Sequence, residues 1–163
     1  MATHCTHSGK ASCTKPIPDQ INSILIQAEQ LCEAKGLRFT PSRRRVLELV
    51  CQYSEPVGAY ALLDDLKSDG VSAAPPTVYR ALDFLLDNGL IHRLATNNTY
   101  LACAHPQEQH EGVFLVCSSC GITREVHTRG VMSAIKRSAK EYNFKVTHAS
   151  VEVTGICDRC NGQ

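Results

Sequence analysis

The sequence predicts an α+β protein: an N-terminal winged helix-turn-helix domain followed by a C-terminal α/β domain that carries a four-cysteine zinc site. Three observations predict this class. Apolar residues recur at helical spacing through the first half, an alternating two-strand pattern closes that half, and two Cys-x-x-Cys pairs lie in the second half. We expect a disordered tail at residues 1–16, the winged helix at 17–103, a hinge loop at 104–111 and the zinc-binding domain at 112–163.

Length and composition exclude several classes of protein. The chain of 163 residues is 43% hydrophobic, enough to bury a core, and no run reaches the roughly 18 apolar residues of a membrane span. The N-terminus lacks the apolar segment of a secretory signal, and nine cysteines without such a signal favour metal ligation in a reducing compartment over disulfides. We therefore expect a cytoplasmic protein without a membrane segment. The net charge of +1 does not by itself indicate nucleic-acid binding.

The N-terminal tail combines small polar residues with potential metal ligands. Its composition predicts disorder. The alternative is an accessory metal site, because four soft or borderline ligands lie close together in the sequence: His4, Cys5, His7 and Cys13.

Three amphipathic helices are predicted after the tail. The first starts at Asp19 and ends at Gly36. The second has Thr40 as N-cap and Pro41 at its first helical position, and the third ends at Gly70. Apolar residues recur on one face of each helix: Ile21, Ile24, Leu25, Ala28 and Leu31; Val46, Leu47, Val50 and Cys51; Ala59, Leu62, Leu63 and Leu66.

The fourth predicted helix has the clearest boundaries, since Pro75-Pro76 starts it and Asn88-Gly89 ends it. One face is apolar: Val78, Ala81, Leu82, Leu85 and Leu86. Polar or long side chains occupy the other faces: Thr77, Tyr79, Arg80, Asp83 and Asp87. Strand patterns at 90–95 and 99–103 follow around a turn at 96–98, and helices followed by such a hairpin are typical of a winged helix-turn-helix.

The C-terminal part changes to a mixed pattern. Strands are predicted at 113–117 and 122–127, on either side of the first cysteine pair, and at 144–154, leading into the second pair. Between them, apolar residues at helical spacing predict one helix: Val131, Ala134, Ile135, Ala139 and Tyr142.

The two cysteine pairs, Cys117/Cys120 and Cys157/Cys160, have the spacing of a tetrahedral zinc site. Each Cys-x-x-Cys turn directs two sulfurs at one ion, and Gly121 can adopt the positive φ that such a turn often requires. The alternatives are two disulfides or buried cysteines without metal. Because four protein ligands close the coordination shell, this site would stabilise structure, and sensing or chemistry would lie elsewhere.

Three stretches carry a resemblance to a known family: the helix from Pro75 to Leu85 (PPTVYRALDFL), Cys117-x-x-Cys120-Gly121, and Gly155-Ile156-Cys157-x-x-Cys160. Over about residues 19–160 the chain resembles the ferric uptake regulator superfamily of bacterial metal-dependent repressors, most closely its zinc uptake regulator branch. The resemblance implies a homodimer in the bacterial cytoplasm. Its winged helices would bind palindromic double-stranded operator DNA, and its C-terminal α/β domains would form the dimer.

Arg80 is the leading candidate for reading DNA. It is the one long donor on the exposed side of the fourth helix, and a bidentate bond to guanine in the major groove is its natural target. The resemblance places a base-reading arginine here. The alternative is a surface ion pair with Asp83 or Asp87.

Further DNA contacts have weaker support. Tyr60 matches a family tyrosine that contacts DNA, with a half-buried core tyrosine as the alternative. Candidate phosphate contacts complete the set: Thr77, Tyr79, Arg43, Arg44 and Arg45. The three arginines are equally compatible with a solvated face. Asp64 and Lys67 resemble a pair that links two dimers on one operator, and the alternative is an ordinary i,i+3 ion pair.

A sensor requires a second, exchangeable metal site that joins the two domains. The zinc branch uses a His, a Cys, a His and a Glu in this order, which correspond here to His92, Cys103, His110 and Glu125. Because the loop after Cys103 is one residue short, His105 is the substitute for His110. The resemblance thus implies about two Zn²⁺ per subunit, one structural and one regulatory.

The chemistry of this ligand set favours zinc over ferrous iron, because it combines one thiolate with two imidazoles and one carboxylate. The iron branch carries a His-His-Asp-His-like run in the hinge loop, which here reads Ala-His-Pro-Gln. His127 and His148 remain as ordinary strand histidines or as ligands of a third site.

We therefore expect a zinc-responsive transcriptional repressor of zinc uptake genes rather than an enzyme. The alternatives are an iron- or peroxide-responsive repressor of the same superfamily, a zinc-dependent hydrolase or deaminase, and a zinc-ribbon interaction module. A catalytic zinc needs an open coordination position, and the sequence lacks the His-x-Glu…Pro-Cys-x-x-Cys pattern of the deaminases.

Overall fold

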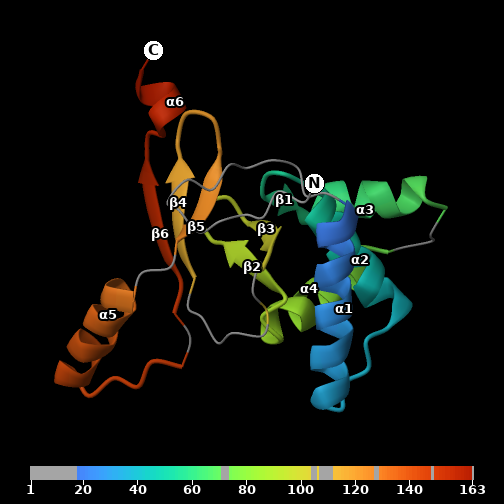
Figure 1. Cartoon of the computed structure of the whole chain (residues 1–163), viewed down its shortest axis with the longest axis horizontal. Coiled ribbons are helices and arrows are strands. Elements are labelled where there is room, and N and C mark those ends of the chain that lie inside the picture. Colours follow the sequence, from blue (N-terminus) through green and yellow to red (C-terminus); the bar gives the residue numbers. More distant parts are fainter. Residues whose placement is uncertain are drawn as a thin grey trace.

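The computed structural model describes residues 18–70, 74–103, 106, 112–126, 129–147 and 149–162 (Figure 1). The tail at 1–16, with its predicted disorder and metal ligands, lies outside these ranges. The N-terminal part contains four helices and three short strands: α1 (Pro18–Ala34), α2 (Pro41–Gln52), β1 (Val57–Gly58), α3 (Ala59–Ser68), α4 (Pro75–Asp87), β2 (Ile91–Leu94) and β3 (Thr99–Ala102). The C-terminal part contains β4 (Val113–Cys117), β5 (Thr123–Val126), α5 (Arg129–Glu141), β6 (Val151–Gly155) and α6 (Asp158–Asn161).

The helix boundaries follow the capping signals of the sequence. In α2, the Thr40 side chain accepts a hydrogen bond from the backbone N–H of Arg43 at 3.4 Å, and proline occupies the first turn. In α4, two prolines open the helix, and Gly89 follows its end with φ of 68°. The four predicted N-terminal helices are thereby confirmed.

The helices of the N-terminal part enclose one core. The α4 residues that enter it are those of the predicted apolar face: Val78, Ala81, Leu82 and Leu85. The opposite face of α4 is consequently left exposed for contacts with another molecule. None of the described helices combines the length and the apolarity that a membrane span requires.

The β2–β3 hairpin, which we call the wing, closes this half of the molecule. It is antiparallel, with Ile91 opposite Ala102 and Leu94 opposite Thr99, and agrees with the prediction to within a residue. The two-residue strand β1 adds to β3, giving the order β1-β3-β2. It was not predicted, because two residues are too short to show an alternating pattern.

The C-terminal sheet has the strand order β5-β4-β6. β4 and β5 form the antiparallel hairpin whose turn carries the first cysteine pair. β6 runs parallel to β4, with Val113 opposite Val151 and Cys117 opposite Gly155. This register brings both cysteine pairs to the same end of the sheet, the end at which α6 lies in Figure 1.

The predicted strand at 144–154 is wrong over most of its length, because the ladder begins only at Val151. Its partner β4 starts at Val113, which pairs with Val151, so within the described ranges the residues before Val151 have no neighbouring strand. The chain leaving α5 first turns at Asn143, which has φ of 54°, and then runs as a loop. The short helix α6 was also not predicted.

The wing lies between the helical core and the C-terminal sheet (Figure 1). Its residues alternate between the two sides. Ile91 and Tyr100 enter the helical core, whereas Leu94 and Leu101 pack against Phe114 and Val116 of the sheet. The two halves of the molecule therefore share a second, smaller apolar cluster through one face of the wing.

Candidate metal centres and nucleic-acid interface

Two ligand sets and one exposed helix are the candidates for function. In the first set, the four sulfurs of Cys117, Cys120, Cys157 and Cys160 lie within 4.8 Å of one another. The Sγ atoms of Cys120 and Cys157 are 3.7 Å apart. A tetrahedral ion with Zn–S bonds of about 2.3 Å separates its sulfurs by about 3.8 Å, so this arrangement fits zinc.

Backbone geometry explains why the sulfurs converge. The N–H of Ser118 donates to the carbonyl of Gly155 at 2.9 Å, which fixes the first cysteine turn to the end of β6. Gly121 has φ of 74°, as the turn requires. The N–H of Cys157 donates to the Cys117 sulfur at 3.3 Å. None of these four cysteines forms a disulfide in the structure, which contradicts the alternative of two disulfides.

The thiol pKa values of Cys117 and Cys120 are shifted in opposite directions. The backbone N–H of Cys157, followed by that of Cys120, lowers the pKa of Cys117 to about 6. Although the N–H of Ile122 lowers the pKa of Cys120, burial and the neighbouring sulfurs raise it to about 11. Backbone hydrogen bonds therefore favour the thiolate of Cys117, whereas the neighbouring sulfurs oppose a second thiolate at Cys120.

The second ligand set spans the two halves of the molecule. The Nε2 atom of His92, on the wing, lies 3.4 Å from Oε1 of Glu125, on β5. Both side chains are largely buried, at 15% and 12% exposure. The centroids of the Phe114 and His92 rings are 5.1 Å apart. Glycine is required at position 112, because a Cβ there would lie 2.4 Å from the Phe114 ring.

Cys103 follows directly after the wing and is fully buried. His92 is opposite Leu101 in the ladder, and the N–H of Cys103 donates to the carbonyl of Leu90 at 3.0 Å. Strand alternation places His92, opposite Leu101, and Cys103, two residues after Leu101, on the same side of the hairpin. His110 and its substitute His105 lie outside the described residues, so the full regulatory set remains a prediction. The leftover His127 and His148 also lie outside them.

Cys32 and Cys51 are buried in the helical core and belong to neither set. Burial, followed by the nearby Glu48 carboxylate, raises the pKa of Cys51 to about 12. Burial also raises the pKa of Cys32. Both remain neutral thiols and act as small apolar residues.

The exposed face of α4 carries the predicted DNA-reading residues. Arg80 and Thr77 are exposed, and Tyr79 is 37% exposed. Within the described part of the chain, arginine ion pairs involve Arg44, Arg45 and Arg124, not Arg80. Tyr60 at the start of α3 is 71% exposed, which contradicts the half-buried alternative.

The three-arginine run at the start of α2 is engaged within the protein. Arg43 lies over the Phe84 ring at 3.6 Å and donates to the carbonyl of Arg38. Arg44 pairs with Glu29. Arg45 lies 2.8 Å from a Glu48 oxygen and 2.6 Å from an Asp69 oxygen, and these hydrogen bonds, that to Glu48 first, raise its pKa. Their predicted phosphate contacts would compete with these pairings.

Asp64 and Lys67 form an ion pair of 3.5 Å within one turn of α3. This is the i,i+3 arrangement considered as their alternative role. Both side chains stay well exposed, at 77% and 57%, so the pair is also accessible to a neighbouring molecule.

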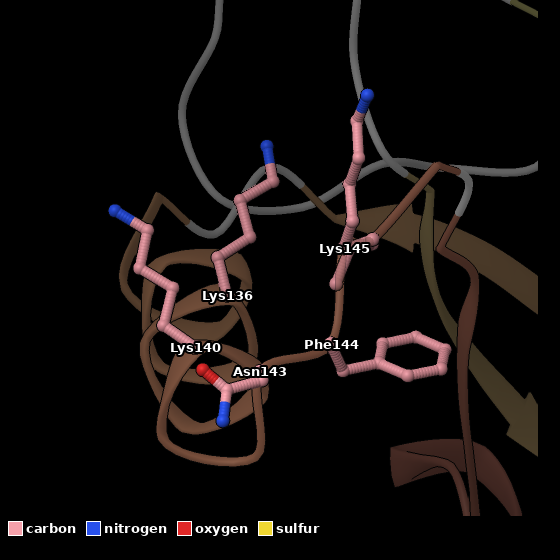
Figure 2. A pocket seen from close by; sticks show the side chains of 6 residues that line it. Lys136, Lys140, Asn143, Phe144 and Lys145 are labelled. Carbon is pink, nitrogen blue, oxygen red and sulfur yellow. The ribbon is translucent and has the colours of Figure 1, made fainter.

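A surface hollow lies at the C-terminal end of α5, well apart from both ligand sets. Figure 2 shows Lys136, Lys140 and Lys145 with their amines directed away from the Phe144 ring, and Asn143 below them. Ammonium groups and an aromatic ring are poor zinc ligands. This hollow therefore adds no third metal site.

Sequence reasoning missed a hydrogen-bonded contact between the two halves. Glu152 on β6 accepts hydrogen bonds from Ala95 and Thr96 at the tip of the wing. The sequence predicted a strand at Glu152, but not that this side chain contacts the wing tip, because that contact depends on how the two halves pack.

A winged helix, a four-cysteine cluster that fits zinc and the His92–Glu125 pair across the boundary define a metal-binding winged-helix protein. The chain belongs to the ferric uptake regulator family, whose sequence model matches residues 34–154. It is 37% identical over 138 residues to the zinc uptake regulation protein of Escherichia coli K12, covering 84% of this chain and 81% of that protein.

Regulators named for other signals are less similar. The ferric uptake regulation protein of Legionella pneumophila is 29% identical over 135 residues, covering 82% of this chain and 98% of that protein. The peroxide operon regulator of Bacillus subtilis is 24% identical over 137 residues, covering 84% and 93%. These values favour the zinc branch over the iron and peroxide alternatives.

Solved structures agree. A zinc uptake regulator complexed with zinc and DNA superposes with a TM-score of 0.82 at 35% identity, covering 87% of this chain and 95% of that one. Holo XcZur gives 0.80 at 41% identity, covering 87% and 99%, whereas apo XcZur gives 0.52 at 43% identity, covering 88% and 99%. The arrangement described here is thus similar to that of the holo form.

Proposed function

We propose that this protein is a zinc-responsive transcriptional repressor, which binds palindromic operator DNA as a homodimer in the bacterial cytoplasm and controls zinc uptake genes. The observation that carries the proposal is the approach of His92 on the wing to Glu125 on the C-terminal sheet, at 3.4 Å. An ion held by residues of both halves stabilises one arrangement of those halves. Metal binding then sets how the winged helices are presented to DNA.

The proposed site consists of His92, Cys103, His110 and Glu125, with His105 as the substitute for His110. Zinc there adds a cation that links an imidazole and a thiolate of the winged-helix half to a carboxylate of the other half. The similarity to holo rather than apo XcZur supports a metal-dependent arrangement. With the four-cysteine site, the count becomes about two Zn²⁺ per subunit, one regulatory and one structural.

DNA recognition is assigned to the exposed face of α4, with Arg80 reading a base and with Tyr60, Thr77 and Tyr79 as further contacts. The support is the exposure of Arg80, Thr77 and Tyr79 on a helix whose other face is buried, and the exposure of Tyr60 at the start of α3. Arg43, Arg44 and Arg45 remain candidate phosphate contacts if their intramolecular pairings open.

Arg80→Ala is expected to weaken operator binding by about 1–3 kcal/mol and to relax preference at one base position per half-site, because a bidentate contact to guanine is lost. Binding to random DNA at low salt should change much less. Fluorescence anisotropy with operator and random duplexes measures both. Arg137→Ala, which removes an exposed arginine from α5, is the matched control. An equal loss on both duplexes would reduce Arg80 to a phosphate contact.

Dimerisation is assigned to the C-terminal domain. Leu115 and Val153 are neighbours in the β4–β6 ladder, on the face opposite to Phe114, and are 44% and 49% exposed. Figure 1 shows α5 beyond the β6 edge rather than over this face. Tyr142 and Phe144, after α5, are 83% and 67% exposed. Exposed large apolar side chains of this kind are typical of a subunit interface.

Leu115→Glu is expected to convert the dimer to a folded monomer, because a charge is placed in the proposed interface while the monomer core is unaffected. Sedimentation velocity measures the association state, and circular dichroism checks folding. Ile26→Glu on α1 is the control, since Ile26 is similarly exposed at 52% in the other half. A dimer that persists in Leu115→Glu with unchanged affinity would place the interface elsewhere.

Two dimers on one operator are proposed to meet through Asp64 and Lys67. The exposure of the pair supports this, and its two residues would exchange partners between dimers. The mass of the complex with operator DNA, measured by sedimentation, gives the number of dimers bound.

A further inference from the structure

The tip of the wing is hydrogen-bonded to the C-terminal sheet through a single carboxylate. Oε1 of Glu152 accepts from the backbone N–H of Ala95 at 2.6 Å. Oε2 accepts from the backbone N–H of Thr96 at 3.1 Å and from its hydroxyl at 2.5 Å. We call these three hydrogen bonds the Glu152 contact. They join segments far apart in the sequence, in the two halves of the molecule.

The register of the sheet places this contact in line with the proposed regulatory site. Phe114 on β4 is opposite Glu125 on one side and opposite Glu152 on the other. Glu125 approaches His92, Phe114 packs on the His92 ring, and Glu152 binds the wing tip. The wing therefore contacts the sheet in three places. The proposed ligand pair His92–Glu125 lies at one end, the Phe114 ring in the middle, and Glu152 at the tip, where the contact needs no metal.

The chemistry of the contact suits a fixed connection. Partial burial raises the pKa of Glu152, but the hydrogen bonds from the Thr96 side chain and from the two backbone N–H groups outweigh it and lower the pKa overall. The carboxylate is thus charged at neutral pH, and its hydrogen bonds are charge-assisted. The turn is itself ordered, since Arg93 Nε donates to Asn98 Oδ1 at 2.9 Å.

We propose that Glu152 is a positioning residue that holds the wing against the C-terminal domain, and that it thereby sets the free zinc concentration at which the protein takes its DNA-binding arrangement. The inference rests on the proposed function. The Glu152 contact occurs in an arrangement that superposes on holo XcZur with a TM-score of 0.80 and on apo XcZur with 0.52.

The reasoning is one of linkage. The Glu152 contact stabilises the DNA-binding arrangement by a constant amount, whatever the zinc concentration. Zinc supplies the remainder through its higher affinity for that arrangement. When the contact is removed, more zinc is needed to reach the same population of the DNA-binding arrangement. The number of zinc ions bound at saturation stays the same, because Glu152 is not among the proposed ligands.

Glu152→Gln keeps the shape of the side chain but replaces one acceptor oxygen by an amide donor. The free zinc concentration at half-maximal operator binding is expected to rise about fivefold or more, with unchanged zinc content at saturation. Thr96→Val removes only the hydroxyl and should raise it about two- to fivefold. In the double variant, the shift of the zinc midpoint should be smaller than the sum of the two single shifts in free energy, because both substitutions act on one contact.

Two controls keep the comparison specific. Thr96→Ser retains the hydroxyl donor, and its zinc midpoint for operator binding should stay close to that of the wild type. Thr154→Val changes an exposed threonine on β6, two residues from Glu152, and should leave the zinc response unchanged. Operator binding is followed by anisotropy in zinc buffers, and zinc content by atomic emission.

A second measurement does not depend on DNA. Amide hydrogen exchange of Ala95 and Thr96, followed by NMR on the full-length protein, reports whether their N–H groups are hydrogen-bonded in solution. Zinc should slow both exchange rates, and Glu152→Gln should speed them. Exchange that is fast in the wild type and unaffected by Glu152→Gln would overturn the proposal, as would an unchanged zinc midpoint. If the wild type bound no operator at any zinc level, the proposed function would fall together with the set-point role, and exchange alone would decide whether the contact positions the wing.

Discussion

Replacement of Cys157 by serine is expected to unfold the C-terminal domain or to dissociate the dimer, while the N-terminal helices stay folded. The four-cysteine cluster joins the β4–β5 turn to the end of β6, which is held to β4 only as an edge strand. Structural zinc contributes on the order of 10 kcal/mol of apparent binding energy to such a fold. The helical half keeps its own core and does not depend on the cluster.

Circular dichroism melting and sedimentation velocity test this expectation, together with the zinc content. The double variant Cys157→Ser/Cys160→Ser removes a whole ligand pair and excludes residual three-ligand binding. Cys32→Ala removes a buried thiol far from the cluster and controls for the loss of a cysteine. A double variant that stayed dimeric with unchanged melting would refute the structural assignment of the cluster.

Cys103→Ser is expected to give a folded dimer that retains one zinc per subunit and no longer binds operator DNA at the zinc levels that suffice for the wild type. Cys103 supplies the one thiolate of the proposed regulatory set, and the four-cysteine cluster is complete without it. Loss of a ligand should lower zinc affinity by about 10–100-fold or more, since even changes around the ligands reach that scale. The DNA-binding arrangement then becomes thinly populated.

Operator binding in buffered free zinc measures the effect. Cys103→Ala is tested in parallel, because Cys103 is fully buried and an added hydroxyl there would need its own hydrogen bond. Cys51→Ser is the control, since Cys51 is a buried thiol of the helical core. Coincident zinc titrations for the wild type and both Cys103 variants would remove Cys103 from the site and, with it, the main chemical argument for zinc over iron.

Strong local signals allowed most of the fold to be predicted. Proline at the start and glycine after the end defined α4, and the apolar spacing identified its buried face. The two Cys-x-x-Cys pairs identified the cluster, because a chain of this spacing has few other ways to satisfy four thiolates. Each of these features has a signal in a short stretch of residues, so the sequence alone was sufficient to predict it.

Features that depend on distant partners could not be predicted. Residues 144–147 show an alternating pattern but form no strand, because β4 begins too late to pair with them. The arginines of α2 resembled a basic surface until their partners were placed beside them: Glu29 on α1, Asp69 just after α3 and Phe84 on α4. The Glu152 contact needed both the parallel β4–β6 register and the packing of the wing.

The central claim is that zinc at the domain boundary controls operator binding. The most direct test is to measure operator affinity in buffered free Zn²⁺ and in free Fe²⁺, with the metal content determined on the same samples. The account predicts that tight binding appears as zinc is raised and as a second zinc per subunit is bound, and that iron at comparable free concentration does not substitute. Equal activation by iron, or operator binding that is independent of metal beyond the first zinc, would contradict it.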